Sequence, residues 1–248
     1  MLEQILPPGV VVVETFQDEP GVALFPEEEA VVARAVDKRR REFTSGRACA
    51  RAALARLVVP PAPLLPGLRG APRWPDGVTG SITHCAGYRA AGVARTRDVA
   101  GLGLDTEPNE ALPDGVLAVI ARDGERTRLG RLEATEPEVS WGRLLFSAKE
   151  SVYKAWFPLA GRWLGFDQAE IIIGALDGTF TARLLVPGPL VAGSPLTVLH
   201  GRWLADRGAR GDGGRRPGLT TGNHSVRPFM PGSRAFGFCR LQRNSSSR

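Results

Sequence analysis

Two stretches of the chain decide its fold: residues 101–107 read GLGLDTE, and residues 146–154 read FSAKESVYK. The first is small, apolar and rich in glycine before two acids, which is typical of a buried strand that ends in a polar loop. The second lies within residues 144–157, where we expect a helix that ends before Pro158. A buried strand followed by a helix indicates a protein of mixed helix and sheet.

Further elements extend this pattern along the chain. Pro26, followed by three glutamates, predicts the start of a helix that continues to about residue 57. Short apolar runs predict strands at residues 80–85, 90–94, 99–105, 170–173, 179–185 and 196–204. We therefore expect an α/β (α+β) fold with two halves, residues 1–104 and 105–207.

The composition is that of a globular protein. Of the 248 residues, 43% are hydrophobic and 23% are charged, which is enough to bury one large core or two smaller ones. The first eight residues do not have the pattern of a secretory signal, and no later stretch is apolar enough to cross a bilayer, so we expect a cytoplasmic protein without a membrane partner. The three cysteines suit neither a disulfide framework nor a zinc site.

The positive charge is concentrated at the end of the chain. The net charge is +6, yet residues 208–248 hold eight arginines and one acid, so residues 1–207 carry a net charge of −1. We therefore expect no specific binding of nucleic acid. The same tail is rich in glycine and arginine, so we expect it to be mostly disordered and dispensable for chemistry.

Asp105 and Glu107 follow the predicted strand at positions i and i+2. Side chains with this spacing point to the same side of a strand, where two carboxylates would suit a hard cation such as Mg²⁺ together with phosphate oxygens. The alternative is an ordinary polar turn before Pro108. Spacing alone leaves both interpretations open.

Glu150 and Lys154 lie one helical turn apart in the second stretch. They match an ordinary i, i+4 ion pair, and Ser147 with Glu150 matches a capping box, so a purely structural interpretation is open. The chain has only three lysines among its 32 basic residues, however, and two of them, Lys149 and Lys154, lie here. Because lysine has a compact charge and a tunable pKa, this choice indicates a requirement that arginine does not meet.

A third group of candidates is basic. Arg40, Arg47 and Arg51 fall on one face of the predicted helix, where they could clamp a phosphate group or face solvent. His84 follows a turn of small residues that allows close approach of a ligand, although a single histidine is more often structural. The three histidines are too scattered to indicate a metal-binding cluster.

Taken in order, these segments resemble the surfactin-type and enterobactin-type 4'-phosphopantetheinyl transferases over residues 15–207. The resemblance rests on four stretches: a basic helix at 39–51, a Gly-Ser-x-x-His element within 74–85, the acidic strand end at 103–107 and the signature helix at 146–154. Each motif is weak alone, whereas four in the same order are specific.

The resemblance implies an enzyme that moves the 4'-phosphopantetheine arm of coenzyme A onto a serine of an apo acyl or peptidyl carrier protein and releases 3',5'-ADP. It implies that Asp105, Glu107 and Glu150 bind Mg²⁺. Glu150, or a metal-bound water, would deprotonate the serine, and Lys154 would stabilise the pyrophosphate. The residues implied in binding coenzyme A are Arg39, Arg47, Arg69, Ser81, His84, Lys149 and Lys154.

The family fold implies two α/β subdomains related by a pseudo-twofold axis, with the active site in the cleft between them, and we expect a monomer. Such proteins continue after the position of residues 201–207 into an apolar final strand, which has no visible counterpart in this glycine-rich, basic tail. Two other activities are compatible with the residues alone: a metal-dependent phosphodiesterase or nucleotidyl transferase, and a non-catalytic binder of coenzyme A.

Overall fold

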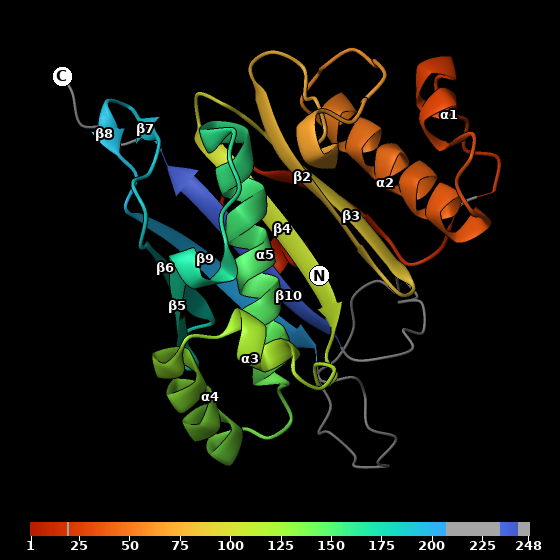
Figure 1. Cartoon of the computed structure of the whole chain (residues 1–248). Helices are drawn as coiled ribbons and strands as arrows, with labels where there is room; N and C mark the ends of the chain where they lie inside the picture. Colours follow the sequence, from red (N-terminus) through yellow and green to blue (C-terminus); the bar gives the residue numbers. More distant parts are fainter. Residues whose placement is uncertain (19, 207–233, 243–248) are drawn as a thin grey trace, which may run out of the picture.

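The computed structural model describes residues 1–18, 20–206 and 234–242. In this part of the chain the strands form two antiparallel sheets, of three and five strands, and a two-stranded ribbon. Helix α2 (Asp37–Arg56) packs on the smaller sheet, and α5 (Trp141–Ala160) crosses the larger one (Figure 1). The expected mixture of helices and sheets is confirmed, while the pseudo-twofold relation of the halves stays a prediction.

The smaller sheet has the strand order β1, β3, β2 and comes from the first half of the chain. The elements of this half are η1 (Leu2–Gln4), β1 (Val11–Thr15), α1 (Pro26–Val32), α2, η2 (Leu68–Gly70), β2 (Val78–Cys85) and β3 (Tyr88–Arg95). The single helix predicted from Pro26 to residue 57 is wrong, because Val36 is extended (φ −65°, ψ 153°) and the helix restarts at Asp37. An acid in the first turn favours that restart.

The larger sheet has the strand order β4, β10, β9, β6, β5. The elements of this half are β4 (Val99–Pro108), α3 (Val116–Ile120), α4 (Asp123–Thr135), α5, η3 (Phe166–Gln168), β5 (Ala169–Gly174), β6 (Thr179–Leu184), β7 (Leu190–Val191), β8 (Ser194–Pro195), β9 (Val198–Asp206) and β10 (Arg234–Gln242). Helix α5 does not end before Pro158 as predicted, but continues to Ala160. Proline lies there in the last turn, where a helix tolerates the missing hydrogen bond better than in its middle.

Strand β10 corrects the prediction for the end of the chain. The expected disorder is wrong for Arg234–Gln242, which lie between β4 and β9 with Gly237 opposite both Asp105 and Trp203. A strand therefore follows β9 in this chain, beyond a stretch of sequence rich in glycine and arginine. The rest of the predicted tail, residues 208–233 and 243–248, lies outside the described residues.

Helix α5 lies unusually close to the strand beneath it. A Cβ atom on Gly103 of β4 would lie 1.8 Å from the carbonyl oxygen of Ser151, so only glycine permits this crossing. Trp141 and Trp156 are fully buried in the core under the helix. The crossing fixes the middle of α5 over the acidic end of β4. In the described residues, no helix combines the length and apolar character needed to span a membrane.

Candidate active site

A cleft of about 470 Å³ lies between α2 and β2 of the first half and α5 of the second. Five of the predicted binding residues line it from the first half: Arg39, Arg47, Arg69, Ser81 and His84. From α5 come Glu150 and Lys154, together with Tyr153 and Phe157. The fold therefore brings the predicted phosphate-binding residues and the signature helix to one cavity, although they are far apart in the sequence.

The acidic end of β4 is tied to α5 by an ion pair. Lys154 Nζ donates to Asp105 Oδ1 (2.7 Å) and to the carbonyl of Leu104 (3.0 Å). Asp105 is 5% exposed, and its second oxygen, Oδ2, is buried without a hydrogen-bond partner in the described structure. An unpaired buried carboxylate oxygen is costly unless a ligand satisfies it. The Glu150–Lys154 ion pair, which the helical spacing left open, is not among the ion pairs of the described residues, and Lys154 contacts Asp105 instead.

Glu107 and Glu150 complete an acidic group around Asp105. Burial, and next the charge of Asp105, raise the pKa of Glu107 to about 7, although Arg143 lies 3.1 Å away. Burial and the charge of Asp105 also raise the pKa of Glu150. The charge of Asp105 thus makes both glutamates harder to ionise, and a bound cation would relieve this repulsion.

The three acids suit a hard cation in type and charge, because carboxylate oxygens are the ligands that Mg²⁺ prefers. The unpaired Oδ2 of Asp105 is the atom that most needs such a partner. In their present arrangement, however, no group of three His, Cys, Asp or Glu side chains in the described part of the chain is placed to hold a metal ion. Arg143 and Lys154 each engage one oxygen of these acids, Glu107 Oε2 and Asp105 Oδ1, and leave Asp105 Oδ2 without a partner among the residues described.

Arg47 supplies a buried cation at the other side of the cleft. It is 6% exposed, its Nε donates to the carbonyl of Leu64 (2.7 Å), and its guanidinium lies 4.2 Å from the centre of the Phe43 ring. Neither Nη nitrogen has a hydrogen-bond or ion-pair partner among the described residues. Burial lowers its pKa to about 10, so the group stays protonated at neutral pH. A buried arginine with two unused donors in a cleft suits an anionic ligand.

His84 and Arg39 lie beside each other at the same cleft. Arg39 Nη1 is 3.5 Å from His84 Nε2, and His84 Nδ1 is 3.8 Å from Glu42. Burial, together with the charges of Lys154, Arg39 and Arg89, outweighs Glu42 and lowers the pKa of His84, so the ring is mostly neutral at pH 7. These residues add hydrogen-bond donors and a positive charge next to Arg47.

Two further predicted residues line the cleft in different ways. Arg69 adopts a left-handed conformation (φ 54°), and its guanidinium lies 5.4 Å from the centre of the Trp163 ring, so it spans from the first half to the second. Ser81 is buried, and its Oγ accepts a hydrogen bond from the backbone of Leu104 (2.9 Å). Ser81 therefore holds β2 against β4 at the residue before Asp105.

The structure places other predicted residues away from the cleft. Lys149 is 3% exposed, lies 2.9 Å from Glu125 and donates to backbone carbonyls of the η3 and β5 region. Its predicted contact with coenzyme A has no support in this arrangement, because its ammonium group is used up in a buried network. Arg40 pairs with Glu29 and Arg51 with Glu28, so only Arg47 of the predicted three-arginine face is unpaired.

The comparisons with known proteins agree with this site. Residues 27–94 match the family model of the 4'-phosphopantetheinyl transferase N-terminal domain, and residues 101–188 match that of the 4'-phosphopantetheinyl transferase superfamily. A 4'-phosphopantetheinyl transferase of Streptomyces mobaraensis, Svp, is 58% identical over 211 residues, which cover 84% of this chain and 86% of that protein. The chain belongs to the 4'-phosphopantetheinyl transferase superfamily. It is therefore an enzyme, a transferase.

Two further relatives show how far the similarity extends. The transferase PptT of Mycobacterium tuberculosis is 50% identical over 200 residues, 79% of this transferase and 87% of the relative. Enterobactin synthase component D of Salmonella typhi is 35% identical over 150 residues, 60% of this chain and 61% of that protein. Proteins of this superfamily use coenzyme A as a substrate and typically depend on a divalent metal.

Several residues of the transferase site were missed by the sequence interpretation. Tyr153 and Phe157 line the cleft one and two turns along α5 from the signature acid, and the helical spacing with Glu150 is the signal that could have found them. Glu42 faces His84 from α2. Glu28 was taken only as part of a helix start, yet it is fully buried, and only the tertiary structure reveals its partners.

Proposed function

We propose that this transferase moves the 4'-phosphopantetheine arm of coenzyme A onto a serine of an apo acyl or peptidyl carrier protein, with Mg²⁺ bound, and releases 3',5'-ADP. The observation that carries the proposal is one cleft with unused binding groups on both sides. Arg47 offers two unpaired donors, and Lys154 joins the cleft to the unpaired oxygen of Asp105. A ligand with separate phosphate groups would satisfy Arg47 and contact Lys154, and a cation held between that ligand and Asp105 would satisfy the unpaired carboxylate oxygen.

Coenzyme A has such groups in its 3'-phosphate and its pyrophosphate. Arg47, with Arg39 and His84, would hold the 3'-phosphate by charge-assisted hydrogen bonds. Lys154 would contact the pyrophosphate, and Arg69 would add positive charge at the mouth of the cleft. This arrangement uses residues of both halves, so coenzyme A would bind only when the halves are joined.

Asp105, Glu107 and Glu150 would hold Mg²⁺, which neutralises charge on the pyrophosphate oxygens when it is bound. The task of these three acids would be to place the cation beside the pyrophosphate. Burial and the charge of Asp105 raise the pKa of Glu107 and of Glu150, and a bound cation would favour the ionised form of both acids.

The transfer step is a displacement at phosphorus. The serine oxygen attacks the β-phosphorus, its bond to phosphorus forms, and the bond from that phosphorus to the bridging oxygen breaks. The electron pair leaves with 3',5'-ADP, whose new negative charge is stabilised by Lys154. Glu150 accepts the serine proton, which suits a half-buried carboxylate with a raised pKa at the cleft. Positioning and charge stabilisation supply most of the rate enhancement.

Intact-mass analysis of an apo carrier protein, incubated with the transferase, coenzyme A and Mg²⁺, tests the proposal. A gain of one phosphopantetheine group supports it. An unchanged carrier with hydrolysed coenzyme A would instead favour the phosphodiesterase alternative, and an unchanged carrier with bound, intact coenzyme A would favour the non-catalytic binder. The cytoplasmic location, the monomeric state and the absence of membrane and nucleic-acid partners stay predictions from the sequence.

A further inference from the structure

Glu28 is a fully buried acid in the first turn of α1. Its Oε2 accepts hydrogen bonds from the backbone of Phe25 (3.1 Å) and from Arg51 Nη1 (2.7 Å), and its Oε1 accepts one from the backbone of Leu64 (2.9 Å). One carboxylate therefore joins the start of α1, the middle of α2 and the loop that follows α2. A buried charge with this many partners is costly to remove, because each partner loses its acceptor.

The network of Glu28 ends at the arginine of the cleft. The backbone N–H of Leu64 donates to Glu28, and the backbone carbonyl of the same residue accepts a hydrogen bond from Arg47 Nε (2.7 Å). Glu28 thus fixes the backbone on which the guanidinium of Arg47 rests. The ring of Phe43 supports the other side of that guanidinium at 4.2 Å. With Nε and the ring face both engaged, the two Nη donors are left for a ligand.

Glu28 also sets the charge balance around Arg47. It forms the ion pair with Arg51, and its charge raises the pKa of Arg47 against the larger lowering by burial. Arg51 is held further by the carbonyl of Ala23 (3.0 Å), so its guanidinium is used within this network. Arg47 is therefore the one of these two arginines whose charge is available to the cleft.

We propose that Glu28 is a positioning residue for recognition of the 3'-phosphate of coenzyme A, acting through Leu64 on Arg47. This inference rests on the proposed function, in which Arg47 binds that phosphate. Glu28 itself is fully buried and is not among the described residues that line the cleft. Its loss is expected to weaken binding of coenzyme A while leaving binding of 3'-dephospho-coenzyme A and the chemical step nearly unchanged.

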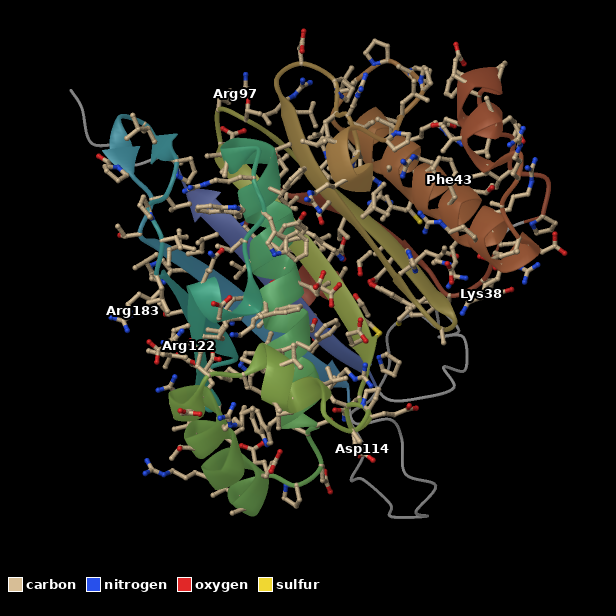
Figure 2. The ribbon with its side chains drawn as sticks, in the orientation of Figure 1. Lys38, Phe43, Arg97, Asp114, Arg122 and Arg183 are labelled. Carbon is tan, nitrogen blue, oxygen red and sulfur yellow. The ribbon has the colours of Figure 1, made fainter. Side chains whose placement is uncertain are left out.

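The second half of the chain contains a matched network that offers a control. Glu125, in the first turn of α4, is 1% exposed and accepts from the backbone of Arg122 (2.8 Å) and of Ile171 (2.6 Å). It also pairs with Lys149 of the following long helix at 2.9 Å. Figure 2 shows Arg122, beside Glu125, on the opposite side of the molecule from Phe43, which supports Arg47. The two acids share burial and a helix-capping bond, but only Glu28 leads to Arg47.

The experiment compares Glu28→Gln, Glu28→Asp and Glu125→Gln with the wild-type transferase. Gln keeps the length of Glu28 and removes its charge, whereas Asp keeps the charge and is too short to reach all three partners. Dissociation constants for coenzyme A and 3'-dephospho-coenzyme A are measured by calorimetry, KM and kcat by carrier modification, and folding by thermal unfolding. We expect the preference for coenzyme A to fall roughly tenfold in both Glu28 variants, the size of one charge-assisted contact, with kcat within about twofold.

The outcomes separate this inference from the proposed function. Glu125→Gln should lower the melting temperature without changing the preference for the 3'-phosphate. Equal losses for the two ligands in the Glu28 variants, or an unchanged preference in Glu28→Asp, would overturn the positioning role. If Glu28→Gln does not fold, Glu28→Asp alone decides. A wild-type protein that binds both ligands equally, or leaves the carrier unmodified, would instead contradict the proposed function.

Discussion

Lys154 Nζ lies 2.7 Å from Asp105 Oδ1, and the other oxygen of Asp105 is buried without a hydrogen-bond partner in the described structure. The first contact neutralises one side of the carboxylate from α5, and the second oxygen is left for a ligand. The pair exists because α5 crosses β4 at Gly103, two residues before Asp105. The proposed metal site at the end of β4 depends on this relationship.

Asp105→Asn should reduce transfer by roughly 100- to 1000-fold, the cost of losing one preorganised electrostatic contact in an active site. Affinity for coenzyme A should change far less, because Arg47 remains in place. Initial rates of carrier modification and calorimetry with coenzyme A measure the two effects. The control is Asp177→Asn, a change at an exposed acid in the turn between β5 and β6, which should be neutral. Wild-type rates for Asp105→Asn would contradict the assignment.

Binding of Mg²⁺ should strengthen as the pH rises from 6 to 8. The pKa of Glu107 is raised from 4.5 to about 7, so the carboxyl is mostly protonated at pH 6 and mostly ionised at pH 8. Because Mg²⁺ binds the ionised form, the proton competes with the metal at the lower pH. The rise in melting temperature caused by Mg²⁺ should therefore be larger at pH 8 than at pH 6. In Glu107→Gln this dependence should flatten. An equal Mg²⁺ effect at both pH values in the wild type would argue against a metal ligand at Glu107.

Gly103→Ala should destabilise the transferase and slow transfer, because its Cβ would lie 1.8 Å from the Ser151 carbonyl and push α5 away from β4. Forced insertion of a methyl group into a packed contact costs about 1–3 kcal/mol or more. Gly130→Ala in α4 is the matched control, since nothing lies within 4 Å of that position. It should stabilise by about 0.5–1 kcal/mol. Denaturant unfolding measures the free energy of unfolding of both variants. Similar free energies for Gly103→Ala and Gly130→Ala would show that α5 can move away from β4 at little cost.

Truncation after Asp206 should abolish folding of the second half, because β10 joins β4 to β9. This reverses the expectation from the sequence that the tail is dispensable. Replacing residues 207–233 by a two-residue turn should keep the protein folded and active, since Asp206 and Arg234 are paired across the two strands. Circular dichroism and carrier modification distinguish the two variants. A folded, active truncation would show that β10 is not required.

Much of the fold could be predicted from local patterns. The strands predicted at 80–85, 170–173 and 179–185 match β2, β5 and β6 closely. An alternating or continuous apolar run is a local signal that can be read from the sequence of the strand itself. Strand β10 could not be predicted, since its partners are distant in the sequence and the segment before it is rich in glycine and arginine. The break between α1 and α2 was missed because helical composition continues through it.

The site was predicted unevenly for a similar reason. Residue type and order indicated Asp105, Glu150 and Lys154 as site residues. The sequence could not show whether Lys154 pairs with Glu150 or with Asp105. Lys149 differs from Lys154 only in the face of α5 on which it lies, and that face is set by the packing of the helix on the sheet. The role of Glu28 depends on a loop 36 residues away, so no local pattern contains it.

The most direct test of the central claim is the mass of an apo carrier protein after incubation with coenzyme A, Mg²⁺ and either the wild-type transferase or Asp105→Asn. The wild type should add one phosphopantetheine group to the carrier serine and release 3',5'-ADP, and a chelator should prevent this. Asp105→Asn should be nearly inactive while still binding coenzyme A. A carrier left unmodified by the folded wild type, or modified equally well by Asp105→Asn, would contradict this claim.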